Sequence, residues 1–185
     1  LPKRLLLVRV PGSREVALTF DDGPHPVHTP RILDTLREER VPATFFLLGS
    51  EIEKRPSLSQ AIVRAGHALG NHSFSHGRMH GMTMNGLAQE IEQTAALIER
   101  TTGAATRLFR PPRGVVTWPL LRYAWRRGWT IVLWSLDSED CRPQATAAAT
   151  RAVLGRARPG DIVLLHEDYA HTADGLREWI RDLKA

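Results

Sequence analysis

The chain has 185 residues, of which 42% are hydrophobic and 24% are charged. This length and composition are typical of one globular domain, here residues 1–185, with enough apolar area for a buried core. The single cysteine excludes an internal disulfide. No stretch reaches the ~18 apolar residues of a membrane-spanning helix, so we expect no integral membrane segment.

The formal net charge is +5, and nearly all of the cationic residues are arginines. A basic chain can indicate a nucleic-acid partner. Most of these arginines stand beside acidic residues in predicted helices, as at residues 37–40 and 177–182. Because this pattern is typical of solvated helix faces, we expect no nucleic acid as a partner.

The apolar pattern of the first half of the chain alternates between strands and helices. Strands are expected over residues 5–10, 16–20, 43–48 and 67–70, and helices over residues 29–40, 57–66 and 85–102. The helices are recognised by apolar residues three or four positions apart, and Gly103 follows the last of them as a common stop signal.

The second half continues this alternation. Strands are expected over residues 107–110, 129–136 and 161–165, and helices over residues 118–127, 143–157 and 173–183. Repeated strand–helix units predict an α/β fold with parallel strands, and about seven of them predict a barrel or a barrel-like sheet. Right-handed crossovers then place the carboxyl ends of the strands at one rim, where barrels carry their chemistry.

Polar or ionisable side chains follow five of these strands at their carboxyl ends. They are Asp21 and Asp22, His72 and His76, Arg110, Asp137 and Asp140, and His166. Chance could place one or two such groups at a strand end. Five together indicate a functional site at that rim.

The adjacent carboxylates of Asp21 and Asp22 repel each other, so their pairing indicates a shared task in which one binds a metal ion and the other handles a proton. His72 and His76 are four residues apart and can converge on one ion. One carboxylate and two imidazoles with an open fourth position are typical of a catalytic zinc site. Zinc is the expected ion, and cobalt, nickel or another divalent ion also suits these ligands.

The polar motifs, in this order, resemble those of the polysaccharide deacetylases, the NodB-homology domain of carbohydrate esterase family 4. The likeness rests on Thr-Phe-Asp-Asp-Gly at 19–23, His-Ser-Phe-Ser-His at 72–76, Arg-Pro-Pro-Arg-Gly at 110–114, Asp-Ser-Glu-Asp at 137–140 and Leu-Leu-His at 164–166. It implies a distorted (β/α)7 barrel and the metal-dependent removal of acetyl groups from acetylated sugars.

The resemblance also implies the roles of single residues. Asp22, His72 and His76 match the metal ligands. Asp21 matches the catalytic base that takes a proton from water, and Arg110 matches the arginine that keeps this base ionised and in place.

The remaining roles fall on the last three motifs. His166 matches the catalytic acid, and Asp140 fits the position of its carboxylate partner better than Asp137 does. The backbone N–H of Arg113, together with Leu164, matches the part of the site that binds the substrate and the oxyanion.

Two residues depart from the usual family pattern, because Arg113 stands where tyrosine is common and Cys141 where tryptophan is common. Both positions line the substrate groove in relatives, so the apolar wall that packs against a sugar ring differs here. The guanidinium of Arg113 suits an anionic group such as a phosphate, a uronic acid or a lactyl carboxylate.

The expected reaction is N-deacetylation of an amino-sugar polymer or oligosaccharide of the chitin or peptidoglycan type, with an acetylated carbohydrate as the partner. Two alternatives stay open: an O-acetyl (xylan-type) esterase with the same site, and a non-catalytic carbohydrate-binding pseudoenzyme. We expect a monomer. The chain begins at Leu1, as a processed fragment would, and a polymer substrate favours the cell surface or the exterior.

Overall fold

The computed structural model describes residues 5–185 of the chain. The strands are β1 (Leu6–Leu7), β2 (Ala17–Asp21), β3 (Thr44–Leu47), β4 (Ala68–Asn71), β5 (Leu108–Phe109), β6 (Thr130–Val132), β7 (Leu136–Asp137) and β8 (Ile162–His166). The helices are α1 (His28–Glu39), α2 (Gly49–Lys54), α3 (Pro56–Arg64), α4 (Met84–Thr102), α5 (Trp118–Arg127), α6 (Ala147–Leu154) and α7 (Ala170–Lys184), with a 3-10 turn η1 at Pro112–Gly114. Among residues 5–185, none of the helices combines the length and the apolar character that a membrane crossing needs.

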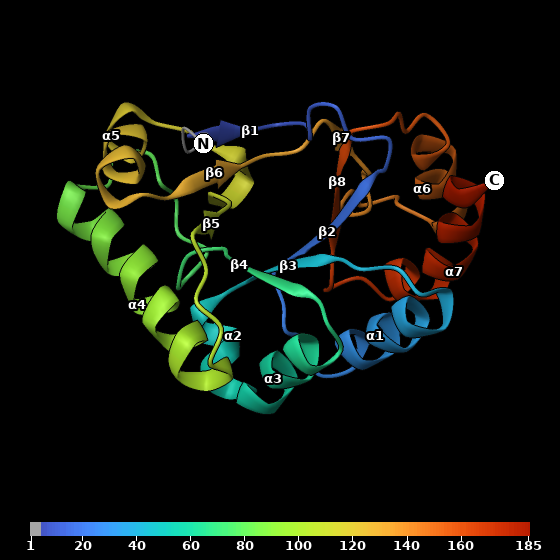
Figure 1. Ribbon diagram of the computed structural model, residues 1–185, viewed down its shortest axis with the longest axis horizontal. Helices are drawn as coiled ribbons and strands as arrows, with labels where there is room; N and C mark the ends of the chain where they lie inside the picture. Colours follow the sequence, from blue (N-terminus) through green and yellow to red (C-terminus); the bar gives the residue numbers. More distant parts are fainter. Residues whose placement is uncertain (1–4) are drawn as a thin grey trace.

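The named strands form one sheet in the order β1-β6-β5-β4-β3-β2-β8-β7, and every neighbouring pair is parallel. The sheet curls, and the helices form an arc around its outside from α5 and α4 to α7 and α6 (Figure 1). Within the described residues, no helix lies beyond the edge strand β1, at the top of the view in Figure 1. The expected α/β fold with a distorted barrel is confirmed, and eight strands rather than seven build it.

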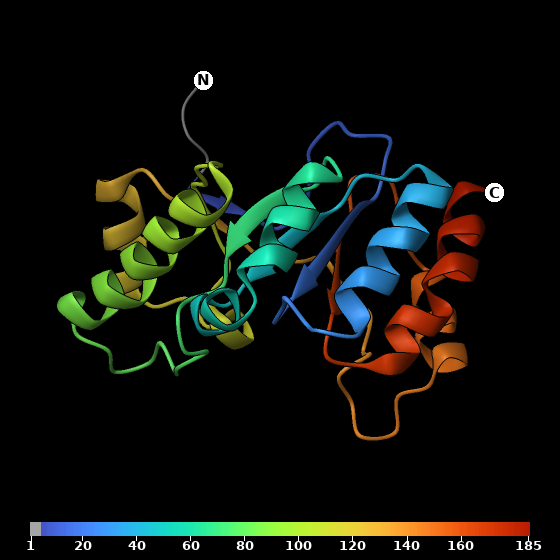
Figure 2. The ribbon, with the colours of Figure 1, turned by 90° about the horizontal axis from the view of Figure 1, so that it is seen from below.

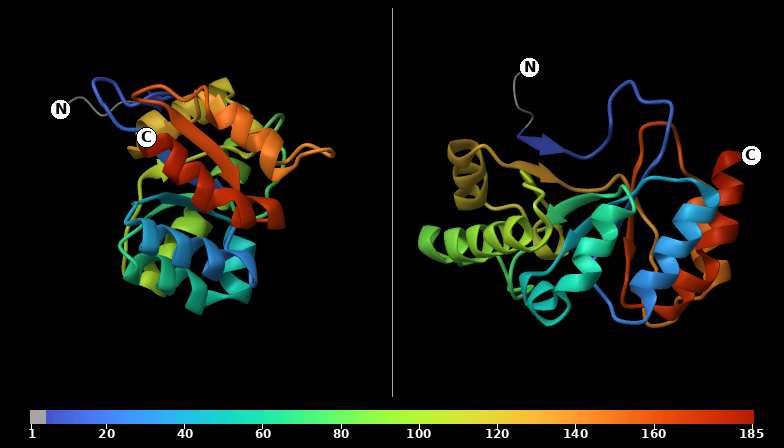
Figure 3. Two further views of the ribbon diagram at one scale, coloured as in Figure 1. Left: turned by 90° about the vertical axis from the view of Figure 1, so that its right-hand side faces the viewer. Right: turned by 60° about the horizontal axis from the view of Figure 1, so that its bottom comes forward.

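The strand ends that matter for function lie on one side of the molecule. The arrowheads of β2 and β8 point the same way, and the segment between β7 and α6 projects beyond them (Figure 2). On the outside of the sheet, α1 and α7 lie side by side (Figure 3). In the parallel pair of β2 and β8, Asp21 lies opposite His166.

The strand expected over residues 129–136 is wrong as a single element, because it forms β6 and β7 at different places in the sheet. β6 pairs with β1 and β5, whereas β7 pairs with β8 at the opposite edge. Between them, the carbonyl oxygens of Val132 and Leu133 accept hydrogen bonds from the buried Arg110 guanidinium, at 3.2 and 3.1 Å. The segment 133–135 therefore leads from β6, which lies next to the edge strand β1, to β7 at the other edge of the curled sheet.

The helix α2 is not predicted by the sequence pattern, since its six residues are too few for an apolar repeat. Its first N–H groups donate to the loop after β4: Gly49 to the Ser73 carbonyl and Ser50 to the Phe74 carbonyl, each at 3.0 Å. Tertiary contacts thus start this helix.

Several expected elements are shorter in the structure than in the sequence pattern, and the strand expected over residues 107–110 is reduced to β5. The strand expected over residues 5–10 is reduced to β1. The helix expected over residues 143–157 begins only after Thr146, whose hydroxyl accepts a hydrogen bond from the Ala149 N–H at 3.1 Å. A threonine that caps a helix in this way sets its start.

Two apolar clusters hold the helices against the sheet. One joins β2, β3 and β8 to α1, α3 and α7, with Phe20, Phe45 and Trp179 in it. The other joins β5 and β6 to α4 and α5, with Phe109 and Trp129 in it. Each buried phenylalanine contributes about 1.5–3 kcal/mol, so the strand ends rest on a tightly packed core.

Candidate active site

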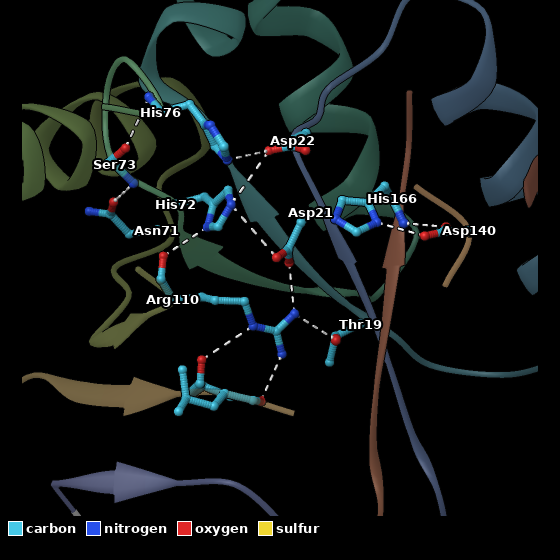
Figure 4. Close-up of polar contacts among 12 residues, drawn as sticks. Thr19, Asp21, Asp22, Asn71, His72, Ser73, His76, Arg110, Asp140 and His166 are labelled. Carbon is cyan, nitrogen blue, oxygen red and sulfur yellow. Dashed lines mark hydrogen bonds and ion pairs between the residues drawn. The ribbon is translucent and has the colours of Figure 1, made fainter. Parts of the chain in front are cut away.

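Asp22, His72 and His76 come together at the carboxyl ends of β2 and β4 (Figure 4). Oδ1 of Asp22 lies 3.4 Å from Nε2 of His72 and 3.4 Å from Nε2 of His76. Each residue offers one ligand atom, and the three atoms lie within 4.8 Å of one another. The side chains that the sequence indicates as metal ligands therefore converge on one point.

Left-handed backbone conformations aim these ligands, since φ is 72° at Asp22, 72° at Ser73 and 58° at His76. Residues with a Cβ rarely adopt such angles unless the surrounding structure holds them. The Ser73 N–H donates to Oδ1 of Asn71 at 2.9 Å, and the His76 N–H donates to Oγ of Ser73 at 3.1 Å. Nδ2 of Asn71 in turn donates to the Ile91 carbonyl of α4 at 2.7 Å, which anchors the turn.

The donor set fits a divalent cation. Nδ1 of His72 lies 2.8 Å from the carbonyl oxygen of Arg110, so Nδ1 carries the proton and Nε2 presents its lone pair to the other ligands. Among the described residues, Oδ1 of Asp22 is buried without a hydrogen-bond partner. A buried carboxylate oxygen with no partner costs free energy, and a cation beside it removes that cost.

The pKa values of the two candidate histidine ligands also favour this assignment, and the raised pKa of Asp22 reflects a buried charge that a cation would stabilise. Burial, reinforced by the charge of Asp21, raises the pKa of Asp22 to about 7. Burial lowers the pKa of His72 to about 4 and lowers the pKa of His76 as well. Both imidazoles are therefore neutral near pH 7, which is the form that binds metal ions.

Asp21 lies beside this ligand set and is held by Arg110 (Figure 4). Nη1 of Arg110 lies 2.7 Å from Oδ1 of Asp21 and 2.8 Å from Oγ1 of Thr19. The other carboxylate oxygen, Oδ2, lies 3.6 Å from Nε2 of His72. One oxygen of Asp21 is thus bound to arginine, while the other lies next to the metal-ligand set.

His166 ends β8, and its ring is bonded to Asp140. Nδ1 of His166 lies 2.7 Å from Oδ1 of Asp140, and the His166 backbone N–H donates to Oδ2 at 2.8 Å. Burial alone would lower the pKa of His166, but the hydrogen bond and the charge of Asp140 raise it to about 9. His166 is therefore protonated at neutral pH, and Nε2 carries a proton that can be given away.

The two candidate partners of His166 differ in their surroundings. Asp140 is fully buried, and both of its carboxylate oxygens take part in hydrogen bonds to His166. Asp137 is exposed and accepts a hydrogen bond from the Glu139 N–H at 2.9 Å. The structure thus brings Asp140, and not Asp137, to the histidine.

Arg113 and Leu164 lie close to this group. Arg113 is exposed in η1 with a φ of 59°, and its charge adds to burial in lowering the pKa of His76. Within residues 5–185, its backbone N–H donates to no acceptor. Leu164 is buried in β8 two residues before His166, so both face the same side of the strand.

Several supporting residues escape the sequence analysis. Thr19 lies two residues before Asp21 in β2 and shares its face of the strand, so strand periodicity could have identified it. Oγ1 of Thr172 donates to Oδ2 of Asp140 at 2.9 Å, and Nε2 of His171 lies 3.0 Å from the Asp140 carbonyl oxygen. Both come from the start of α7, and no motif links them to Asp140.

Glu167 is a further buried acid beneath the turn after β2. Its carboxyl group bonds to the Thr29 hydroxyl and accepts from the His25 N–H at 3.5 Å, while Oε1 has no partner among the described residues. Burial outweighs these hydrogen bonds and raises the pKa of Glu167 to about 8. Gly23 lies so close to this carboxyl group that a Cβ there would overlap it.

Comparison with known proteins assigns this arrangement to a family. The sequence profile of the polysaccharide deacetylases matches residues 9–132, more than half of the chain. The chain belongs to the polysaccharide deacetylase family. Its profile match covers the first three motifs, whereas Asp140 and His166 lie beyond it.

Individual relatives agree with the family assignment. A peptidoglycan-N-acetylglucosamine deacetylase from Bacillus cereus is 40% identical over 155 residues, which cover 84% of this chain and 56% of the relative. The chain thus spans little more than half of that protein's length. A crystal structure of a peptidoglycan N-acetylglucosamine deacetylase in complex with 4-naphthalen-1-yl-N-oxidanyl-benzamide has a TM-score of 0.93 and 35% identity, covering 98% of this chain and 87% of the other.

The same fold also occurs without activity. A CE4 family pseudoenzyme from Bacillus anthracis has a TM-score of 0.91 and 28% identity, covering 97% of this chain and 64% of the other. Because the fold is shared with a pseudoenzyme, activity has to be judged from the residues at the rim.

Proposed function

We propose that this member of the polysaccharide deacetylase family is a metal-dependent hydrolase that removes N-acetyl groups from an amino-sugar polymer or oligosaccharide. The observation that carries the proposal is one rim that holds three convergent metal ligands, a carboxylate tied to a buried arginine, and a histidine tied to a buried aspartate. The names of the Bacillus cereus relative and of the solved structure support a substrate of the peptidoglycan type. Chitin-type oligomers carry the same N-acetyl group.

Asp22, His72 and His76 would hold the cation, which we propose to be zinc. Cobalt and nickel are other ions that one carboxylate and two imidazoles accept. A cation bound there lowers the pKa of water and polarises an acetyl carbonyl. The unpaired Oδ1 of Asp22 and the free Nε2 of His72 support this assignment.

Asp21 is the proposed base. Arg110 binds its Oδ1, which leaves Oδ2 to accept the proton of the attacking water. His166 is the proposed acid, and its Nε2 proton passes to the leaving nitrogen, because an amine is a poor leaving group unless it is protonated. Asp21 and His166 lie opposite each other on adjacent strands, so acceptor and donor face the substrate at the same level.

The backbone N–H of Arg113 is the proposed donor to the oxyanion that forms at the acetyl carbon. It is suited to this role because it has no other acceptor in the described part of the chain. Leu164 supplies apolar surface on the same side of β8 as His166. The exposed guanidinium of Arg113 suits a substrate that carries an anionic group.

The test is acetate release from chitin oligomers, peptidoglycan and acetyl-xylan, run with a chelator and with each divalent metal added back. We expect metal-dependent release from an N-acetylated substrate, and with Asp22→Ala no metal bound at the Asp22–His72–His76 set and no release. The matched control is Asp34→Ala, which removes an exposed carboxylate of α1 and should leave both unchanged.

The other outcomes favour the other functions. Release from acetyl-xylan alone would assign an O-acetyl esterase with the same site. No release from any substrate with any metal would overturn the proposal and favour a carbohydrate-binding pseudoenzyme.

A further inference from the structure

A second group of potential metal ligands lies near the first and shares no residue with it. Asp140, Cys141 and His166 each offer one ligand atom, and these atoms lie within 4.8 Å of one another. The group forms where the segment between β7 and α6, which projects beyond the strand ends, meets the end of β8 (Figure 2). Cys141 takes no part in the proton transfers of the proposed deacetylation.

Two of the three ligands are oriented by the fold itself. Oδ2 of Asp140 accepts hydrogen bonds from the His166 N–H at 2.8 Å and from Oγ1 of Thr172 at 2.9 Å. Oδ1 of Asp140 faces Nδ1 of His166 at 2.7 Å. This pair lies on the far side of Asp21 from His72 (Figure 4). An ion at the pair would therefore bind separately from an ion at the first ligand set.

Cys141 supplies the third ligand. It directly follows Asp140 and is exposed, so its thiol can turn toward an ion without disturbing the buried carboxylate. Thiolate and imidazole together select zinc or cadmium over the harder magnesium and calcium ions.

We propose that Asp140, Cys141 and His166 bind a second divalent cation of the zinc or cadmium type, and that this ion switches the enzyme off. The inhibitory effect rests on the proposed function of His166 as the acid. An ion on Nε2 occupies the lone pair that must carry the transferable proton. An ion on Nδ1 breaks the bond to Asp140 that keeps the ring protonated.

The distances suit a tetrahedral ion after small side-chain shifts. Zinc–ligand bonds of roughly 2.0–2.3 Å set neighbouring ligand atoms roughly 3.3–3.8 Å apart. The ligand atoms of the group lie within 4.8 Å of one another. An ion on Nδ1 of His166 has to part the 2.7 Å hydrogen bond between Nδ1 and Oδ1 of Asp140. Binding releases the thiol proton of Cys141 and one proton of His166.

Cadmium is the probe for binding, because a cadmium–thiolate bond gives an ultraviolet charge-transfer absorption that carboxylate and imidazole ligands do not give. Protein loaded with one equivalent of zinc is titrated with cadmium. We expect the absorption to saturate at one added equivalent in the wild type and to be absent in Cys141→Ser. Asp22→Ala, which lacks a ligand of the first set and is titrated without added zinc, should show the same absorption as the wild type.

His166→Gln distinguishes cadmium bound by all three residues from cadmium bound by the cysteine alone. Losing a group that merely supports a ligand already weakens metal binding about 10–100-fold. Removing His166 itself should therefore weaken cadmium binding by at least about 100-fold. Equal binding by the wild type and His166→Gln would mean that cadmium meets only the cysteine, and would overturn the proposal.

The inhibitory role is tested with zinc, because cadmium could also replace the ion at the first ligand set. We expect excess zinc to lower the rate of acetate release by wild-type protein at least about tenfold. Measured against its own rate without excess zinc, Cys141→Ser should need at least about tenfold more zinc for the same fractional loss, since it lacks one ligand.

Two results would overturn the proposal: no cadmium–thiolate absorption in the wild type, or the same sensitivity to zinc in the wild type and Cys141→Ser. If no variant releases acetate under any condition, the proposed function fails. The cadmium titration then still tests metal binding by Asp140, Cys141 and His166, because it does not depend on activity.

Discussion

Asp21 and Arg110 form an ion pair inside the curled sheet, with Nη1 of Arg110 2.7 Å from Oδ1 of Asp21 and both side chains at most 3% exposed. Burying two charges is costly unless further hydrogen bonds satisfy them. Arg110 also donates to Thr19 and to the carbonyl oxygens of Val132 and Leu133. The pair is therefore held at a fixed place and orients the second oxygen of Asp21 toward His72.

The first prediction concerns Asp21→Asn, which keeps an oxygen for Arg110 but removes the proposed base. We expect the protein to bind as much metal as the wild type and to lose at least about 100-fold in rate, because general base catalysis contributes about 10²–10⁴-fold. Metal content by atomic emission and acetate release measure the two effects. A variant with the full rate would rule out Asp21 as the base.

The second prediction is a change in pH dependence with Asp140→Asn. The acid must be protonated, so the wild-type rate should fall as pH rises through about 9, the pKa that Asp140 gives His166. Without the carboxylate, burial lowers the pKa of His166, and the alkaline limb of kcat/KM should move to lower pH. Asp137→Asn, at an exposed carboxylate, should leave the limb in place. An unchanged limb in Asp140→Asn would contradict the assignment of His166.

The third prediction concerns Gly23→Ala. The new Cβ would overlap the buried carboxyl group of Glu167, and overpacking of this kind costs about 1–3 kcal/mol. We expect lower stability to urea and weaker metal binding, because Asp22 precedes this glycine. The control is Gly86→Ala in α4, where the nearest atom to a Cβ is 3.5 Å away and stability should not fall. Equal stabilities of the two variants would contradict the prediction, because the turn would then accommodate the Cβ without cost.

The fourth prediction follows from the buried acid Glu167. Its pKa is raised from 4.5 to about 8 by burial, so the fold prefers the neutral form. Glu167 therefore contributes most to stability at pH values below its pKa in the unfolded chain, about 4.5. The contribution is lost as pH rises from about 4.5 to about 8. Glu167→Gln cannot ionise and should not show this loss.

Urea unfolding with a chelator present, at pH 5 and at pH 9, measures the effect. From pH 5 to pH 9, the unfolding free energy of the wild type should fall by at least about 1 kcal/mol more than that of Glu167→Gln. Glu99→Gln, at an exposed glutamate of α4, should show no such gain. Parallel pH profiles for Glu167→Gln and the wild type would contradict the burial argument.

Much of the site could be predicted from the sequence because its residues follow apolar runs directly. A strand followed by Asp22, or by His72, places the side chain at the rim whatever the details of packing. The elements that the sequence did not predict correctly depend on hydrogen bonds to distant residues instead. The helix α2 starts on hydrogen bonds from the loop after β4, and residues 129–136 break into two strands where Arg110 takes up the carbonyl oxygens.

The sequence by itself determined the family, the alternation of strands and helices apart from α2 and the β6–β7 break, and the set of polar residues at the strand ends, since each is a local pattern. Only the tertiary structure decided the partners within that set. Arg110 meets Asp21 from 89 residues away, and His166 meets Asp140 rather than the exposed Asp137. These contacts depend on strand register and on the curl of the sheet, which arise when separate elements pack together.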